Sequence, residues 1–379
     1  MPLMAKKKQK IRASFRKNRS SRARQHDWTQ KFADQDSATE DTARDERLSG
    51  KGALTRKRTV IGAESINVDG VEHLHLEVDA ECLRGRVLSV HGLASAVEAT
   101  DGVVYQCATR RILKTLTTDQ RHVVAAGDQV LFRLAPTGEG VIERVEPRYG
   151  VLSRTSRGRQ HIIVTNVDQL LIVASAAEPY LKPNLIDRFL ISAHKAGLRP
   201  LVCINKVDLV DPAALQPLVG VYSQMGYQVL LLSVQTGLGI DRLRRAMAGR
   251  SSAVAGQSGV GKSSLLNAVD AQLNLRVSAV SAESQKGRHT TTTARLWPLT
   301  TGGYVVDTPG IRQFQLWDVI PAEVGGYFRD LRPYINHCRF PNCTHTHEID
   351  CAVKNAVADG RLDARRYESY CQLWLGEMT

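Results

Sequence analysis

The pattern of hydrophobic and polar positions changes character near residue 149. From residue 81 to 148 the apolar residues occur in short runs separated by glycine-containing turns, which is typical of short strands. From residue 149 to 310, longer apolar runs alternate with segments of helical spacing, which is typical of a doubly wound α/β sheet. The chain therefore predicts a small barrel followed by an α/β domain. The expected barrel strands are Leu83–Val90, Gly102–Ala108, Gln129–Leu134 and Gly140–Val145.

Several elements beyond residue 149 are recognisable from their composition and their ends. Residues 167–174 form a nearly continuous apolar run, which predicts a buried strand. A helix is expected over 183–196, because a proline stands in its first turn and Gly197 provides a C-terminal stop. Two more helices are expected near the C-terminus, over 352–358 and 364–375.

Charge is distributed unevenly along the chain. The net charge is +13, and residues 1–24 contain ten Lys or Arg residues but no Asp or Glu. Few apolar residues accompany them, so we expect residues 1–80 to form a basic, largely disordered extension. Such an arm suits RNA binding with salt-dependent affinity, and the alternative is a tail that only increases solubility.

Composition also indicates where the protein works. No apolar run reaches the roughly 20 residues that span a membrane, and the basic N-terminus lacks the apolar core of a signal peptide. Seven cysteines, three of them clustered near the C-terminus, suit a reducing compartment better than a disulfide framework. We expect a cytoplasmic, monomeric protein without a membrane partner.

A phosphate-binding motif lies within the α/β region. Residues 256–263 match G-x-x-x-x-G-K-[ST], follow the apolar run 252–255 and precede a helical run over 264–269. In this context backbone N–H groups surround phosphate oxygens, Lys262 reaches the β- and γ-phosphates, and the Ser263 hydroxyl binds Mg²⁺. The expected nucleotide contacts are Gly256, Gln257, Ser258, Gly259, Val260, Gly261, Lys262, Ser263 and Ser264.

A base-recognition motif precedes the phosphate motif in the chain. It consists of Asn205, Lys206, Val207 and Asp208. The Asp208 carboxylate can accept hydrogen bonds from the ring N–H and the exocyclic amine of guanine, a pair of donors that adenine lacks. Ser233 begins a loop after the apolar run 229–232, and this loop would support the guanine oxygen. The motifs together predict GTP and GDP as ligands.

Two switch segments complete the nucleotide motifs. Asp307 follows an apolar strand and can reach Mg²⁺ through water, and the Gly310 N–H can sense the γ-phosphate. Residues 286–293 contain a run of threonines, in which Thr291 or Thr292 is the expected Mg²⁺-sensing residue. The base motif comes first here, whereas an ordinary GTPase begins with the phosphate motif. Such a circular permutation retains the same sheet, because motif geometry depends on strand neighbours.

Residue types that bind metals are clustered near the C-terminus. Three cysteines and nearby histidines within about fourteen residues suit tetrahedral Zn²⁺, and four protein ligands would make the site structural. The cysteines are Cys338, Cys343 and Cys351, and the candidate histidines are His337, His345 and His347.

The motifs resemble those of the circularly permuted, small-ribosomal-subunit-dependent GTPases of the RsgA (YjeQ) family. The resemblance covers roughly residues 80–375 and rests on the phosphate motif, on Gly-Arg-His-Thr-Thr-Thr at 287–292, and on Cys-x4-Cys-x-His-x5-Cys. It implies an OB-fold for the barrel, selects His345 as the fourth zinc ligand, and implies late assembly of the small ribosomal subunit, with its rRNA as a partner. One departure is Arg110-Arg111, where the family usually has Arg-Gly.

The residue that orients the attacking water differs from the usual one. Ras-like GTPases carry a Gln directly after the Asp-x-x-Gly motif, and Ile311 stands at that position here. His289 in the first switch is our catalytic candidate, because a neutral imidazole could orient or deprotonate the water. The alternatives are that His289 only packs and that Gln313 substitutes. Unaided turnover is expected to be slow.

Two basic surfaces are expected to contact RNA, one on the barrel and one near the C-terminus. The first consists of Arg110, Arg111, Lys114, Arg121 and Arg133. The second consists of Arg361, Arg365, Arg366 and Tyr367.

The expected organisation therefore has four parts, namely the N-terminal extension (1–80), an OB-fold RNA-binding barrel (81–148), a circularly permuted P-loop GTPase domain (149–318) and a helical zinc-binding domain (319–379). The expected function is a GTPase that assembles the small ribosomal subunit. Two alternatives are an RNA-binding scaffold that holds GTP as a structural ligand, and a GTPase that assembles the large subunit.

Overall fold

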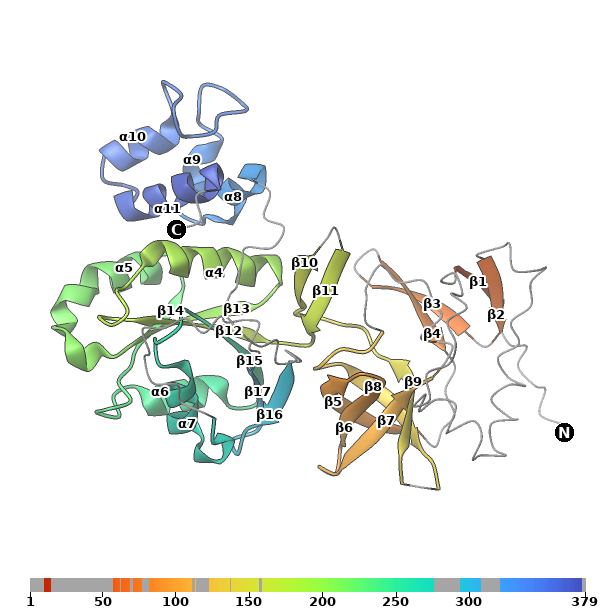
Figure 1. Ribbon diagram of the computed structural model, residues 1–379. Coiled ribbons are helices and arrows are strands. Elements are labelled where there is room, and N and C mark those ends of the chain that lie inside the picture. Colours follow the sequence, from red (N-terminus) through yellow and green to blue (C-terminus); the bar gives the residue numbers. More distant parts are fainter. Residues whose placement is uncertain are drawn as a thin grey trace, which may run out of the picture. The chain divides into compact units, whose positions relative to one another are not determined.

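Short strands in the first half of the chain and alternating strands and helices in the second half follow the expected division (Figure 1). This computed structural model divides into two units, one of Met1–Tyr149 with Ser153–Asn166 and the other of Gly150–Leu152 with Val167–Thr379. The structure describes residues 10–14, 57–61, 63–68, 71–76, 82–110, 113, 123–136, 138–156, 159–275, 294–307 and 321–376.

Four short strands occur within the basic N-terminal segment. β1 (Lys10–Ser14) pairs with β2 (Lys57–Ile61), and β3 (Ala63–Val68) pairs with β4 (Val71–Leu76), both antiparallel. These paired stretches depart from the expectation of a largely disordered extension. β-Branched residues occur in each of the three stretches between residues 57 and 76, and such residues favour strands. For the rest of residues 1–80, disorder stays a prediction.

Five strands of the first unit close into a small barrel. The neighbours in order are β5 (Leu83–His91), β6 (Ala94–Ala99), β7 (Val104–Thr109), β9 (Gly140–Val145) and β8 (Gln129–Leu134), and β8 also pairs with β5. The β7–β9 pairing is parallel and the other four are antiparallel. This closed arrangement is of the OB type. Its buried core includes Val87, Val97, Cys107, Val130, Phe132 and Ile142.

The sequence did not predict β6 and began β7 two residues early, at Gly102. The β6 sequence Ala-Ser-Ala-Val-Glu-Ala buries alternate positions, but its small residues give a weak hydrophobic signal. Gly102 has a φ of 83° and lies in the turn between the two strands. The other three expected barrel strands are confirmed to within one residue.

A buried carboxylate joins the barrel to the chain that leaves it. Asp128 accepts hydrogen bonds from the Ala125 N–H at 2.8 Å and the Thr165 hydroxyl at 2.7 Å. Arg148 approaches both Asp128 oxygens at 2.7 Å and compensates the buried charge. Thr165 follows a hairpin of β10 (Leu152–Ser156) and β11 (Arg159–Val164).

Six neighbouring strands of the second unit form the expected doubly wound sheet. Their order is β14 (Gln228–Leu231), β13 (Arg199–Asn205), β12 (Gln169–Ser175), β15 (Arg250–Ala255), β17 (Gly303–Asp307) and β16 (Arg295–Pro298). Within this group the β16–β17 pairing is antiparallel and the others are parallel. The carboxyl ends of the parallel strands therefore meet at one edge.

Helices cover both faces of this sheet. α4 (Pro183–Lys195) and α5 (Gln216–Gln224) lie on one face, and α6 (Ile240–Met247) and α7 (Lys262–Val269) lie on the other (Figure 1). Because both faces are covered, a central strand such as β12 is buried along nearly its whole length and reads as a continuous apolar run.

The C-terminal segment consists of four helices. They are α8 (Pro321–Tyr327), α9 (Arg332–Ile335), α10 (Ala352–Ala358) and α11 (Ala364–Leu375), and the last two have the predicted bounds. Their shared core also contains Ile191 of α4, so this segment does not complete its core alone. Within the part of the chain that the structure describes, no helix has both the length and the apolar character needed to cross a membrane.

Candidate nucleotide and metal sites

The loop between β15 and α7 has the backbone of a phosphate-binding loop. Gly256 has a φ of 146°, and a Cβ there would collide with the carbonyl oxygen of Val173. Gly261 has a φ of 90°, and a Cβ would lie 2.5 Å from the Asn205 Nδ2 atom. Both positions therefore require glycine. α7 begins at Lys262, so its unpaired N–H groups point toward the loop.

Side chains of the first turn of α7 complete this loop. The Lys262 ammonium donates hydrogen bonds to the carbonyl oxygens of Gly256 at 2.8 Å and Gln257 at 2.6 Å. These bonds hold the positive charge over the loop, where a phosphate would meet it. Ser263 and Ser264 follow, both half-buried. The arrangement suits a phosphate group with a bound cation.

Asn205 fastens the base motif to the phosphate loop. Its Nδ2 atom donates to the Val260 carbonyl at 2.9 Å. The side chain is buried, and among the described residues its Oδ1 atom has no hydrogen-bond partner. A buried acceptor without a donor is costly, so this atom indicates a place for a donor from outside the protein.

The residues after Asn205 turn sharply at the end of β13. Lys206 has a left-handed φ of 61°, and the next three residues form a 3₁₀ turn, Val207–Leu209. Val207 is buried and anchors the turn, whereas Asp208 is exposed. The Asp208 carboxylate is therefore accessible to a base bound at this edge of the sheet.

Ser233 organises the neighbouring loop after β14. Its hydroxyl accepts a hydrogen bond from the Thr236 N–H at 3.1 Å, and its own N–H donates to the Leu238 carbonyl at 3.0 Å. The preceding Leu232 carbonyl accepts from the Val207 N–H at 3.2 Å. The structure thus brings this loop beside the base motif.

One further loop, residues 175–182, joins the same edge and was not predicted. The Glu178 carbonyl accepts hydrogen bonds from the Ser175 hydroxyl at 2.9 Å and the Lys206 ammonium at 2.5 Å. The sequence signal for this loop is only its position after a central strand, where ligands bind in open α/β sheets. It lines a small pocket whose walls include Tyr180, Lys182, Leu185, Gln257 and Val260.

The switch residues fall outside the described part of the chain. They are His289, Thr291, Thr292, Gly310, Ile311 and Gln313. The backbone of Asp307 is described, and it ends β17 beside β15, the strand that leads into the phosphate loop. The roles of these residues stay predictions.

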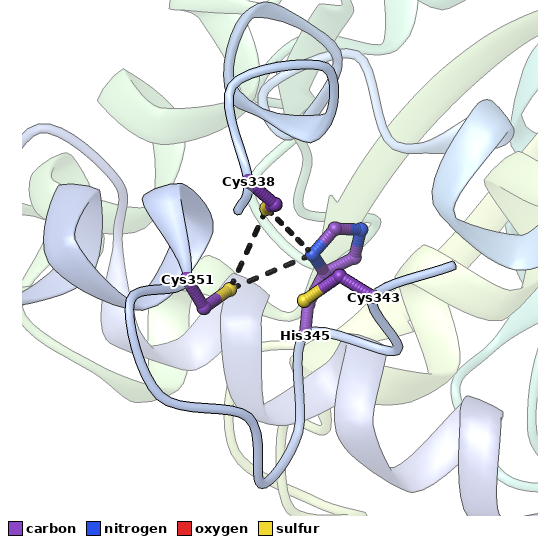
Figure 2. A group of neighbouring side chains, drawn as sticks. All are labelled: Cys338, Cys343, His345 and Cys351. Atoms are coloured by element: carbon purple, nitrogen blue, oxygen red, sulfur yellow. Dashed lines mark hydrogen bonds between the residues drawn. The ribbon is translucent and has the colours of Figure 1, made fainter. Parts of the chain in front are cut away.

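Four side chains of the C-terminal segment converge as the sequence predicted. The ligand atoms of Cys338, Cys343, His345 and Cys351 all lie within 4.8 Å of one another (Figure 2). The Cys338 and Cys351 sulfurs are 3.8 Å apart, and the His345 Nδ1 atom lies 3.3 and 3.5 Å from them. Zinc–sulfur bonds of about 2.3 Å in a tetrahedron place two sulfurs about 3.8 Å apart, so the set fits Zn²⁺.

The surroundings of the cluster agree with a metal site. The Tyr367 hydroxyl donates to the His345 carbonyl at 2.8 Å and fixes the loop. Burial and the neighbouring thiols raise the pKa of Cys343 to about 12, and a bound dication would reverse this preference by binding thiolate. The competing candidates His337 and His347 are both exposed and lie outside the cluster.

Two arginines of the basic surface expected on the barrel share one carboxylate. Arg110 lies 2.5 Å and Arg133 lies 3.7 Å from the carboxylate of Glu143, which is buried. One negative charge offsets only one of the two positive charges, so contact of this surface with RNA stays a prediction. Arg111, Lys114 and Arg121 lie outside the described residues.

The basic surface expected near the C-terminus needs correction. Arg366 is buried, and it occupies the same face of α11 as the buried Ser369 and Tyr370, three and four residues later. This spacing was visible in the sequence and could have identified an inward-facing arginine. Arg361 and Arg365 pair with nearby carboxylates at 3.4 and 2.8 Å.

Comparison with known proteins identifies the family. A sequence model described as RsgA GTPase matches residues 145–317. The small ribosomal subunit biogenesis GTPase RsgA of Sodalis glossinidius is 38% identical over 312 residues, which cover 80% of this chain and 89% of that protein. The chain belongs to the RsgA GTPase family. The RsgA protein of Pectobacterium carotovorum is 41% identical over 292 residues, covering 76% of this chain and 82% of the relative.

Solved structures of RsgA-like proteins share this fold. YjeQ from Thermotoga maritima superposes with a TM-score of 0.63 at 34% identity, over 78% of this chain and 98% of that chain. YloQ, described as a circularly permuted GTPase, superposes with a TM-score of 0.61 at 28% identity, over 79% and 97%. The predictions of family, of GTPase activity and of a permuted GTPase fold with a barrel and a Cys/His cluster are confirmed.

Proposed function

We propose that this RsgA-family GTPase acts in late assembly of the small ribosomal subunit, binds its rRNA and hydrolyses GTP when stimulated by the subunit. The main support is the 38–41% identity to relatives that are named for small-subunit biogenesis. GTP favours the docked state, and hydrolysis after subunit contact releases the protein. We assign it to the cytoplasm as a monomer.

The nucleotide site divides its work between backbone and side chains. Residues 256–264 surround the phosphates, and Asp208 accepts two hydrogen bonds from guanine. Asn205 supports the base from beneath through its bond to the phosphate loop. The loop that begins at Ser233 backs the guanine oxygen, and the stem of Lys206 covers the ring.

Magnesium and the switches complete the nucleotide site. Ser263 and Asp307 would hold Mg²⁺, the first through its hydroxyl and the second through water, because both lie at the same edge of the sheet. Thr291 or Thr292 senses the cation, and the Gly310 N–H senses the γ-phosphate. The unpaired Asn205 acceptor and the required glycines support the nucleotide site that these residues would complete.

His289 orients the attacking water in this scheme. Ile311 cannot form the hydrogen bond that a Gln makes in Ras-like GTPases, so another group must act. A switch residue of this kind acts efficiently only when a partner orders its loop. Dependence on the small subunit follows from that requirement.

The Cys/His cluster would hold a structural Zn²⁺. All four ligands come from the protein, which leaves no position for a substrate. The metal would fix the loop between α9 and α10 and so shape the C-terminal segment for subunit contact.

RNA binding is assigned first to the basic arm of residues 1–24. Because Glu143 offsets one of the two positive charges of Arg110 and Arg133, these arginines contribute a net charge of only about +1 to the barrel surface. Lys and Arg residues that neutralise phosphates give binding that weakens steeply with salt.

Nucleotide-dependent co-sedimentation tests the partner. The protein loaded with a non-hydrolysable GTP analogue should sediment with purified small subunits and be released by GDP. A GTPase of large-subunit assembly would instead sediment with large subunits. A scaffold that holds GTP structurally would bind small subunits equally in both nucleotide states, and either result would contradict the proposal.

A further inference from the structure

Arg366 of α11 lies in a solvent-free site with only 3% of its surface exposed. Its Nε and Nη2 atoms donate to the carboxylate of Asp330 at 2.8 and 2.9 Å. Its Nη1 atom lies 2.5 Å from Oδ1 of Asp187, and the guanidinium stacks 4.3 Å from the Phe328 ring centroid. A planar guanidinium held on three sides has a strongly preferred position.

Asp187 carries this contact onto α4 of the nucleotide-binding sheet. It is buried, and its Oδ1 atom also accepts a hydrogen bond from the Tyr222 hydroxyl of α5 at 2.8 Å. Burial raises the pKa of Asp187, and the charge of Arg366 acts in the opposite direction. A buried ion pair of this kind is costly to break from one side, because the remaining charge stays unpaired.

Other contacts seat the C-terminal segment along the whole of α4. Near the start of the helix, the Asn184 amide donates to the Gln372 amide oxygen at 2.9 Å. At its end, Lys195 lies 3.6 Å from Glu323. Ile191 lies between them in the core of the C-terminal segment. α4 therefore packs against both the nucleotide-binding sheet and the C-terminal segment, and both determine its position.

The same helix forms a wall beside the phosphate loop. Leu185, Ile186 and Phe189 of α4 line the same small pocket together with Gln257 and Val260. Asp187 lies in the same helical turn as these residues. A displacement at Asp187 would therefore move the wall that faces the phosphate loop.

We propose that Arg366 is a positioning residue for nucleotide binding, which holds α4 and the adjoining wall of the phosphate loop through its ion pair with Asp187. The coupling between the sites is reciprocal, so nucleotide binding stabilises α11 in return. This inference rests on the proposed nucleotide site at residues 256–264. It assigns the C-terminal segment a part in GTP binding in addition to any contact with the subunit.

Hydrogen exchange of the full-length protein, with and without GDP, tests the coupling. Amides of α7 report on nucleotide binding itself, and amides of α11 report on transmission through Arg366. In the wild type, GDP should slow exchange at both helices, by about fivefold or more at α11, which is the lower end of typical coupling.

An apolar replacement of the Asp187–Arg366 pair removes the link between α4 and α11 without leaving an unpaired charge on either helix. In Asp187→Leu/Arg366→Met, apolar side chains occupy the site, and Asp330, whose side chain is 15% exposed, keeps some contact with solvent. GDP should still protect α7 in this variant but no longer protect α11, and GDP affinity should fall about fivefold or more. Arg366→Lys should restore part of the affinity, and it supplies the test if the double variant does not fold.

Glu368→Gln is the matched control, because it removes a charge from the exposed face of the same helix. It should behave as the wild type. Protection of α7 without protection of α11 in the wild type would overturn the coupling and leave the nucleotide site intact. Protection of neither helix would contradict the nucleotide site itself. Undiminished protection of α11 in the double variant would exclude Arg366 as the link. Full GDP affinity in both single variants, Arg366→Lys and Arg366→Met, would exclude it as well.

Discussion

The nucleotide site and the metal cluster are built in opposite ways. The nucleotide site draws on loops at residues 175–182, 205–208, 233–238 and 256–264, which only the parallel sheet brings together. The metal cluster uses the continuous stretch from Cys338 to Cys351. The nucleotide site forms only while the sheet is folded. The metal cluster is formed by one short stretch, so it can unfold while the sheet stays folded. The four helices around the metal cluster, α8–α11, pack against α4, which belongs to the nucleotide-binding sheet.

Loss of a metal ligand should have the largest effect, and it should be local. Cys343→Ser should release one equivalent of zinc and unfold the helices around the cluster, because structural zinc contributes about 10–16 kcal/mol in small zinc-finger peptides. GDP should still bind, since the phosphate loop belongs to the core of the sheet, but its affinity should fall about fivefold or more because α11 would no longer hold α4. Metal analysis and hydrogen exchange measure both results, and wild-type protein purified without zinc under reducing conditions would refute the assignment.

A change in the base motif should have an intermediate effect, confined to nucleotide choice. Asp208→Asn replaces the bidentate acceptor for guanine, and losing one such pair costs about 1–3 kcal/mol, or roughly 5- to 150-fold in GTP affinity. Xanthine nucleotides should gain relative to guanine nucleotides. Titrations with GTP, XTP and ATP test this, and unchanged affinities in the variant would remove Asp208 from base recognition.

Removal of the basic arm should have the smallest effect on the folded units. A chain without residues 1–24 lacks ten positive charges, so its affinity for small subunits should fall and its salt dependence should flatten. GTP affinity should not change. Binding isotherms at several salt concentrations measure this, and an unaltered slope would show that the arm makes no phosphate contacts.

The sequence predicted the parts of both sites whose chemistry is contiguous. Glycines at 256 and 261 are required by backbone geometry, and Cys338 to Cys351 follow a ligand spacing, so short motifs sufficed. The loop at 175–182 contributes through a backbone carbonyl, for which sequence carries no residue signal. Small residues concealed β6.

Pairing between distant charges was the other source of error. Arg110 and Arg133 were expected to face RNA, yet both lie near Glu143. No sequence motif links this glutamate to either arginine. Arg366 is compensated by Asp187, which is far away in sequence. An arginine looks the same in a sequence whether its partner is a phosphate or a distant carboxylate, and only the fold separates these cases.

Single-turnover GTP hydrolysis, with and without purified small subunits, tests the central claim most directly. Wild-type protein should turn over slowly alone and at least about tenfold faster with small subunits, well within the factor that an ordered catalytic group supplies. His289→Ala should bind GTP almost normally and lose the stimulation, because the imidazole acts on the water. Equal rates with and without small subunits would contradict the account, and full stimulation of His289→Ala would transfer the catalytic role to Gln313 or to a group of the ribosome.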